Sequence, residues 1–161
     1  MRFIEALNRG LFTLAAIATL VMAALGLGIV VLRYGFATGW IAGQESLLYL
    51  HALVFLVAAA TTLSDEGHVR VDIFYGRWSA RRQALVDLGG SLLLLLPFAL
   101  FIAGVSLDYV ADAWQRRETS TEAGGLGIVY LLKSLMLVFA VQMLLQALVQ
   151  ARRAWQTMRA A

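Results

Sequence analysis

The sequence predicts an all-α membrane protein that forms one domain over residues 1–161. Two observations point to this fold class. First, 61% of the residues are hydrophobic and only 14% are charged, whereas a soluble domain carries about 25% charged residues. Second, the apolar residues fall into four runs of membrane-spanning length that charged segments separate. The expected transmembrane helices cover about 11–32, 46–64, 88–107 and 126–150, and an interfacial amphipathic helix covers about 69–85.

The first apolar run is the longest one without a charge. Leu11 to Leu32 contains no Asp, Glu, Lys or Arg. At ~1.5 Å per residue it spans ~33 Å, enough to cross a hydrocarbon core of ~30 Å. A secretory signal has a shorter apolar region followed by a small-residue cleavage site. Here Arg33 and Tyr34 follow the run, so we expect a retained transmembrane helix.

The connection before the second span predicts a loop that ends at an acid. Residues 33–44 contain three glycines, which break regular structure, and Trp40 suits the membrane interface. Glu45 then precedes a span without formal charge. A carboxylate there favours the positive end of the helix dipole and can cap the helix. The functional alternative is a salt bridge from Glu45 to a partner subunit.

His51 is the ionisable side chain inside the second span. One interpretation is a proton-relay group, because ionisable residues within membranes are often functional. The other is a neutral imidazole that is hydrogen-bonded to a neighbouring helix, and we favour this second interpretation.

Charged and apolar residues alternate in the connection between the second and third spans. It carries four arginines and four acids: Arg70, Arg77, Arg81, Arg82, Asp65, Glu66, Asp72 and Asp87. A helix drawn through residues 72–84 places Ile73, Phe74 and Trp78 on one side and arginines on another. This pattern favours an amphipathic helix at the membrane surface, with a solvated loop as the alternative.

The last two spans each contain a residue that is unusual in a membrane. Pro97 lies near the middle of the third span, removes the hydrogen bond to the carbonyl of Leu93 and predicts a kink. Lys133 lies near one end of the fourth span, where it can pair with an acid or a phospholipid, or snorkel to the interface, which we favour. The expected interface anchors are Trp40, Trp78, Lys133, Arg152 and Arg153.

The distribution of arginine predicts the orientation in the membrane. Four spans place both termini on one side. The N-terminal arm, the 65–87 connection and the C-terminal tail hold nine arginines, and the other two connections hold three. Because cytoplasmic segments carry the excess of Lys and Arg, both termini are predicted to be cytoplasmic. The 33–45 and 108–125 connections then face the opposite side.

The residues give little support for enzyme or cofactor chemistry. The chain has no cysteine, so disulfides and thiolate metal sites are excluded. His51 and His68 are ~25 Å apart along a continuous helix, too far to bind one haem within one chain, and His51 has no carboxylate or second histidine at helical zinc-ligand spacing. The basic residues form no stripe for nucleic acid. We therefore expect no catalytic residue, cofactor or metal site, although a bound phospholipid is compatible with this composition.

Taken in order, the polar residues resemble a known family. The sequence Gly-His-Val-Arg-Val-Asp at 67–72 is similar to the Gly-His-(Ile/Val)-X-Val-Asp strip of the small membrane subunit of tripartite ATP-independent periplasmic (TRAP) transporters, the DctQ-like family. The likeness covers nearly the whole chain. The other matching positions include Glu45, Tyr49, Arg82, Asp87, residues 118–126 and Lys133. The departures are Gly127 and residues 135–137, in regions where the family often has proline, and His51, where it often has an aromatic residue.

The resemblance implies a supporting role in uptake. In such transporters a large membrane subunit carries the substrate and sodium sites, and a periplasmic binding protein delivers the substrate, typically an organic acid. The small subunit is not an enzyme. It packs on the large one among the lipids of the bacterial inner membrane and helps dock the binding protein. By this analogy the interface or structural residues are Glu45, Tyr49, His68, Arg70, Asp72, Arg82 and Asp87. The alternatives that stay open are a small intramembrane redox protein and a self-assembling channel.

Overall fold

The computed structural model describes residues 2–65, 67 and 72–160, and the regular structure in these ranges is helical. The first two helices are α1 (Arg2–Gly35) and α2 (Ile41–Ser64). A short helix, α3 (Asp72–Tyr75), precedes α4 (Ala80–Gly90). A π-helical segment, η1 (Ser91–Leu95), joins α4 to α5 (Leu96–Gln115), and α6 (Val129–Ala160) follows.

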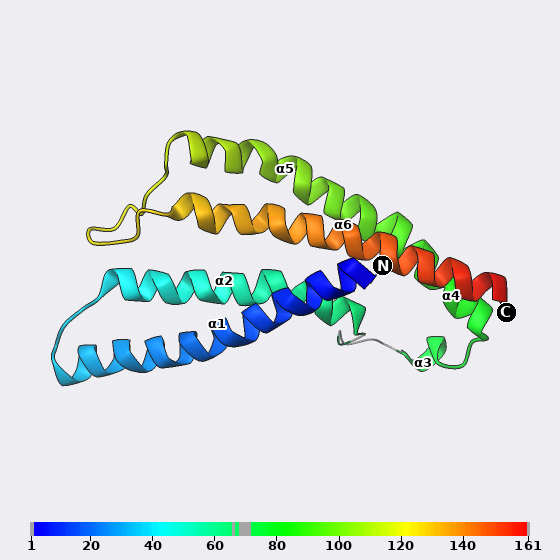
Figure 1. Cartoon of the computed structure of the whole chain (residues 1–161), viewed down its shortest axis with the longest axis horizontal. Coiled ribbons are helices and arrows are strands. Elements are labelled where there is room, and N and C mark those ends of the chain that lie inside the picture. Colours follow the sequence, from blue (N-terminus) through cyan, green and yellow to red (C-terminus); the bar gives the residue numbers. More distant parts are fainter. Residues whose placement is uncertain (1, 66, 68–71, 161) are drawn as a thin grey trace.

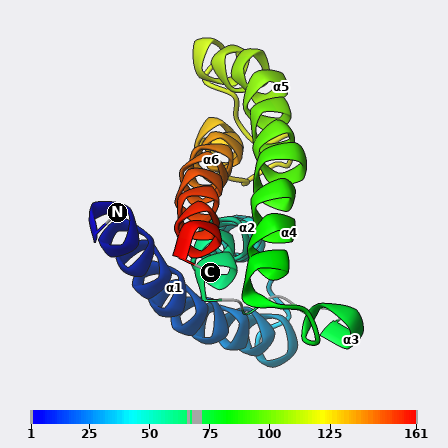
Figure 2. The same cartoon turned by 90° about the vertical axis from the view of Figure 1, so that its right-hand side faces the viewer.

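The long helices form two antiparallel hairpins that lie side by side (Figure 1). α1 pairs with α2 and α5 pairs with α6, while α2 and α4 both pack against α6. The loops at 36–40 and 116–128 lie at one end of the bundle, and α3 and both termini lie towards the other end. Figure 2 is seen from that second end, with α6 between α1 and α4.

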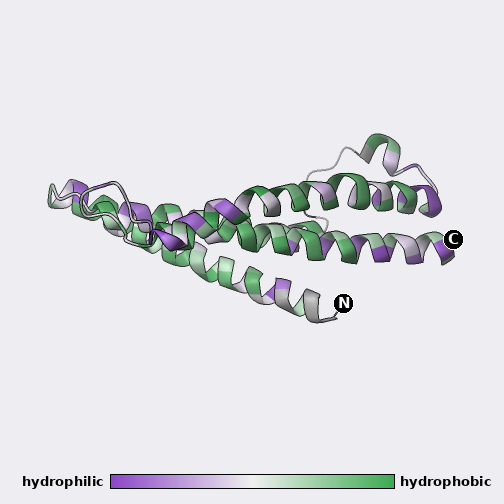
Figure 3. Cartoon of the chain, turned by 90° about the horizontal axis from the view of Figure 1, so that it is seen from above, coloured by the Kyte–Doolittle hydropathy of each residue, from purple (hydrophilic) through white to green (hydrophobic). Residues whose placement is uncertain are grey.

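Four helical stretches are long and apolar enough to cross a membrane. They lie within Asn8–Gly35, Ile41–Ser64, Ala80–Gln115 and Val129–Ala160. Figure 3 shows hydrophobic residues along the lengths of these helices and hydrophilic residues concentrated towards their ends and in the loops. Within the described residues, the predicted all-α architecture with four helices long and apolar enough to span a membrane is therefore confirmed, while the limits of each span stay predictions.

Small residues bring the helices together. Ala60 on α2, Ala99 on α5 and Met143 on α6 form a buried cluster in which both alanines are fully inaccessible. Small side chains let helix backbones approach closely, which strengthens the van der Waals packing between helices in lipid. Larger side chains such as Phe139 and Leu63 cover the cluster. The core thus lies where the two hairpins meet.

The predicted loop at 33–44 is longer than the observed one. α1 continues through Gly35, and α2 already begins at Ile41, so irregular backbone covers only residues 36–40. Gly43 is buried inside α2 beneath the ring of Trp40, where an added Cβ would collide with that ring. The glycine therefore serves close packing within a helix. Backbone groups at a membrane must be satisfied internally, which favours helix over loop.

A second correction concerns the helix expected through residues 72–84. α3 ends at Tyr75, and α4 begins at Ala80 after Ser79 in an extended conformation. A turn through Gly76 separates them, in which the N–H groups of Arg77 and Trp78 donate to carbonyls three residues earlier. Residues 69–71 of the expected interfacial segment lie outside the described residues.

The α3 turn is nevertheless fixed to α4. The Tyr75 hydroxyl donates a 2.7 Å hydrogen bond to Asp87, and the Gln83 amide donates to the Tyr75 carbonyl at 3.0 Å. Ile73 and Phe74 remain 66% and 72% exposed. An apolar surface of this kind suits contact with lipid at the interface, which stays a prediction.

The third span contains an irregularity directly before its proline. Through η1 the helix widens, and the N–H of Leu96 donates to the carbonyl of Ser91, five residues earlier. Pro97 follows shortly after this π-helical segment and has no N–H to donate within the continuous helix. Single π turns of this kind bend helices. A kink caused by Pro97 itself stays a prediction.

Candidate functional site

Glu45 lies at the loop end of the bundle and holds the connection between α5 and α6. Its carboxylate accepts a hydrogen bond from the Ser120 hydroxyl and another, 2.6 Å long, from the backbone N–H of Leu126. Glu45 is the fifth residue of α2, whereas Trp40 occupies the N-cap position and makes no side-chain cap bond. The expectation that Glu45 caps α2 is therefore wrong, because the side chain is engaged by a distant loop.

The loop that Glu45 holds folds back on itself. The N–H of Ser120 donates to the carbonyl of Leu126 at 2.9 Å, and the N–H of Val129 donates to the carbonyl of Glu118 at 3.1 Å. The two limbs of the loop therefore run side by side. Each limb gives Glu45 one donor, Ser120 from the first and Leu126 from the second. One carboxylate thus ties both limbs to α2.

Two glycines in this loop have specific conformational roles. Gly124 has φ +79°, a left-handed conformation that side chains disfavour. At Gly125 an added Cβ would meet the Ser120 side chain and would lie 2.8 Å from Glu45 Oε1. The loop can therefore close over the carboxylate only if residue 125 has no side chain.

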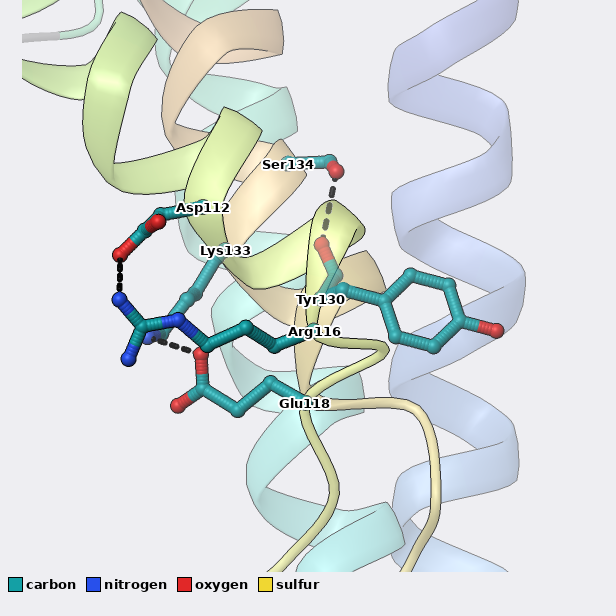
Figure 4. Close-up of polar contacts among 6 residues, drawn as sticks. All are labelled: Asp112, Arg116, Glu118, Tyr130, Lys133 and Ser134. Atoms are coloured by element: carbon teal, nitrogen blue, oxygen red, sulfur yellow. Dashed lines mark hydrogen bonds and ion pairs between the residues drawn. The ribbon is translucent and has the colours of Figure 1, made fainter.

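An ion pair fixes the base of the same loop (Figure 4). The Lys133 ammonium lies 2.5 Å from Glu118 and 3.9 Å from the centre of the Tyr109 ring. The Lys133 side chain is only 15% exposed, whereas in the nearby Arg116–Asp112 pair the side chains are 74% and 56% exposed. Pairing with an acid thus replaces the simple snorkelling that the sequence favours, because the folded-back loop brings Glu118 to Lys133.

Trp114 and Ser134 connect α5 to α6 beside this ion pair. The indole N–H of Trp114 donates to the Ser134 hydroxyl at 2.8 Å, and that hydroxyl donates to the Tyr130 carbonyl. The rings of Trp114 and Tyr130 meet edge to face at 4.7 Å between centroids. Tyr49, one turn beyond Glu45 on α2, is half-buried. The loop end of the bundle is therefore held by contacts among α2, α5, α6 and the 116–128 loop.

A second polar set lies inside the bundle along α6. Gln146 is 1% exposed and accepts a 3.2 Å hydrogen bond from the Asn8 amide of α1. The Thr61 hydroxyl of α2 donates to the Asn8 carbonyl at 2.9 Å. Gln142 and Gln150 donate to carbonyls at Val57 and Leu63 of α2. These side chains tie α1, α2 and α6 together.

Sequence reasoning missed this polar set. The signal was available, since Gln142, Gln146 and Gln150 follow one another at four-residue spacing and thus share one face of a helix. Such amides hydrogen-bond across helices in membranes. They were missed because an uncharged glutamine hardly interrupts an apolar run.

Arg82 and Asp87 lie apart from the Glu45 site, at the other end of the bundle. His68 and Arg70 are outside the described residues, and Asp72 is the first residue of α3. Arg82 and Asp87 lie on α4, where Arg82 is exposed and Asp87 accepts the Tyr75 hydroxyl. The anchors divide between the two ends: Trp40 and Lys133 at the loop end, and Trp78, Arg152 and Arg153 at the other.

A groove lies between α3, α4 and α6. Its volume is about 1270 Å³, and its lining includes Trp78, Gln83, Asp87, Gln150 and Arg153. Among the residues that the structure describes, no group of three or more His, Asp or Glu side chains is placed to hold a metal ion. His51 is exposed on α2, without a hydrogen bond to any described residue. The bond to a neighbouring helix that we favoured for it is therefore not formed with any described helix of this chain.

The helices and their polar contacts define an integral membrane protein whose interior side chains serve helix packing. A family model described as "Tripartite ATP-independent periplasmic transporters, DctQ component" matches residues 22–157. The chain therefore belongs to the DctQ component family, the small membrane subunits of TRAP transporters, and it is a transporter component and not an enzyme. Membership implies partners within a TRAP complex. Comparisons with curated proteins and with solved structures found no match.

Proposed function

We propose that this chain is the scaffold subunit of a sodium-coupled importer of an organic acid in the bacterial inner membrane. It packs on the large membrane subunit, which carries the substrate and sodium sites, and it helps dock the periplasmic binding protein. Family membership supports the complex, and the geometry of the polar side chains supports the division of labour within it.

The main support for this proposal is that buried polar side chains form hydrogen bonds between helices. The hydrogen bonds of Asn8, Thr61 and Gln146 join α1, α2 and α6. Groups that are used to hold helices together are unsuited to carrying a solute, because a transport pathway needs polar atoms that face a water-filled cavity. A rigid bundle of this kind suits bracing of a moving partner subunit.

The order of the 116–128 loop supports a role in docking the periplasmic binding protein at the loop end of the bundle. Glu45 holds both of its limbs, and Lys133 holds its base through Glu118. A loop that is already ordered loses little conformational entropy when it binds a partner. The arginine distribution favours an orientation with this end of the bundle in the periplasm and both termini in the cytoplasm. The loop is then on the side where the binding protein arrives.

Co-purification tests the proposed function. The full chain, tagged after Ala161, is co-expressed with the large subunit and extracted in mild detergent. We expect a stable complex in which the two subunits occur in fixed ratio. A chain that elutes alone, with the large subunit fully active in its absence, would overturn the proposal. An absorption band of bound haem in the purified chain would instead favour the redox alternative.

A further inference from the structure

The outward side of α2 carries a narrow stripe that differs from the other lipid-facing surfaces. The structure describes all of α2, and its exposed residues are Ile41, Gln44, Leu48, His51 and Phe55. Their spacing alternates between three and four residues. This is the heptad pattern by which one helix packs along another with knobs in holes. By contrast, α1 and α5 expose broad surfaces, on which the Leu20 side chain is 74% exposed and the Phe101 side chain is 64% exposed.

The polar members of the stripe, Gln44 and His51, have no side-chain hydrogen-bond partner in the part of the chain that the structure describes. Thr13 and Thr19 on α1 differ, because their hydroxyls donate to backbone carbonyls one turn earlier. A threonine bonded in this way is tolerated against lipid. An imidazole or amide without a partner is not, because its polar atoms stay unsatisfied in hydrocarbon.

The position of His51 makes this cost large. His51 lies six residues beyond Glu45 on α2, or ~9 Å further along the helix axis, so it lies inside the apolar span, nearer to its loop end. Ionisable residues at that depth face protein rather than lipid in membrane proteins. Because α1 and α6 pack on α2 but leave His51 exposed, the covering protein is not this chain's own bundle.

We propose that the α2 stripe is the seam on which a transmembrane helix of the large subunit packs, with a hydrogen-bonding side chain of that helix opposite His51. The inference rests on the proposed function, in which this DctQ-family chain packs on a larger membrane subunit. The heptad spacing sets the geometry, a partner helix crossing α2 at about 20°. Neutral His51 is both donor and acceptor, so the partner side chain can be of either kind.

Site-specific photo-crosslinking tests the seam in the assembled complex. A photoreactive phenylalanine analogue replaces Leu48 or Phe55 in the stripe, and Leu20 or Phe101 as equally exposed controls on α1 and α5. We expect crosslinks to the large subunit from the two stripe positions and much weaker ones from the controls. Crosslinks to a second copy of this chain, to lipid alone, or equally from all four positions would overturn the seam.

Substitution of His51 tests the hydrogen bond itself. We expect His51→Leu to lower retention of the large subunit on a detergent-washed affinity column by about three- to tenfold, as for the loss of one interhelical hydrogen bond. His51→Gln keeps a donor and an acceptor and should restore retention. Equal retention in all three proteins would contradict the role of His51. Failure of the unsubstituted chain to retain the large subunit would instead count against the proposed function.

Discussion

The Glu45 carboxylate and the Leu126 backbone N–H are 81 positions apart in the sequence and 2.6 Å apart in the structure. This contact joins the α1–α2 hairpin to the loop of the α5–α6 hairpin. The Ser120 hydroxyl adds a second bond to the same carboxylate. One side chain of α2 thus holds both limbs of the 116–128 loop, so the loss of Glu45 should affect a segment far from its own helix in the sequence.

Replacement of Glu45 by alanine should free the 118–126 loop. Both donors lose their acceptor, and we expect the Leu126 amide to exchange with solvent on the order of tenfold faster, as for the loss of a charge-assisted hydrogen bond. Hydrogen exchange measured by mass spectrometry on the detergent-solubilised chain reports this directly. Glu122→Ala is the matched control, an exposed acid of the same loop whose carboxylate binds no described residue. Equal exchange in the two variants would contradict the clamp.

A methyl group at position 125 should disrupt the same contact from the other side. In Gly125→Ala the new Cβ meets Ser120 and Glu45, whereas in Gly127→Ala it meets only Thr119 at an ordinary 3.8 Å. We expect Gly125→Ala to lower the free energy of unfolding by about 1–3 kcal/mol, as overpacking does, with little effect from Gly127→Ala. Reversible unfolding in mixed detergent micelles measures both. A larger loss at position 127 would show that the loop closes differently.

The interior polar set predicts an energetic coupling between two helices. Asn8 and Gln146 share a hydrogen bond, so the variants Asn8→Ala and Gln146→Ala should be non-additive by about 0.6 kcal/mol, and no more than about 1.7 kcal/mol. The control cycle pairs Asn8 with Gln142, which instead bonds the Val57 carbonyl. That second coupling should be near zero. Two equal couplings would show that the loss is general loosening of the core.

The membrane-spanning helices were predictable because they depend on composition alone. The charge-free run from Leu11 to Leu32 fits no other structure at that length. The Glu45 contacts were not predictable, because a carboxylate at a helix start looks like a cap until the position of Leu126 is known. Likewise, Gly43 reads as a loop residue until the Trp40 ring is seen to cover it.

The helix expected at residues 72–84 failed for a different reason. Its hydrophobic pattern is present, and Ile73 and Phe74 are exposed together. The pattern shows which side chains share a surface, but it does not register that the turn at Gly76 interrupts the backbone and lets Tyr75 reach Asp87. The sequence pattern therefore predicted which side chains share a surface, whereas the turn and the Tyr75–Asp87 hydrogen bond determined where the helix is interrupted.

The absence of cysteine makes the orientation directly measurable. Single cysteines at Thr121, in the loop, and at Gln156, near the end of α6, both occupy exposed positions. With cytoplasmic termini, a membrane-impermeant maleimide that reaches the periplasm should label Thr121→Cys in intact cells and Gln156→Cys only after lysis. The reverse pattern would place the 116–128 loop in the cytoplasm and remove its proposed contact with the binding protein.

The central claim is that this chain supports transport without carrying the solute. Its most direct test is sodium-driven uptake into proteoliposomes that contain the large subunit, with the binding protein added outside and a radiolabelled organic acid that the binding protein retains. We expect uptake with the full chain present, a loss to near background without it, and a partial loss with Glu45→Ala. Full uptake by the large subunit in the absence of this chain would contradict the account.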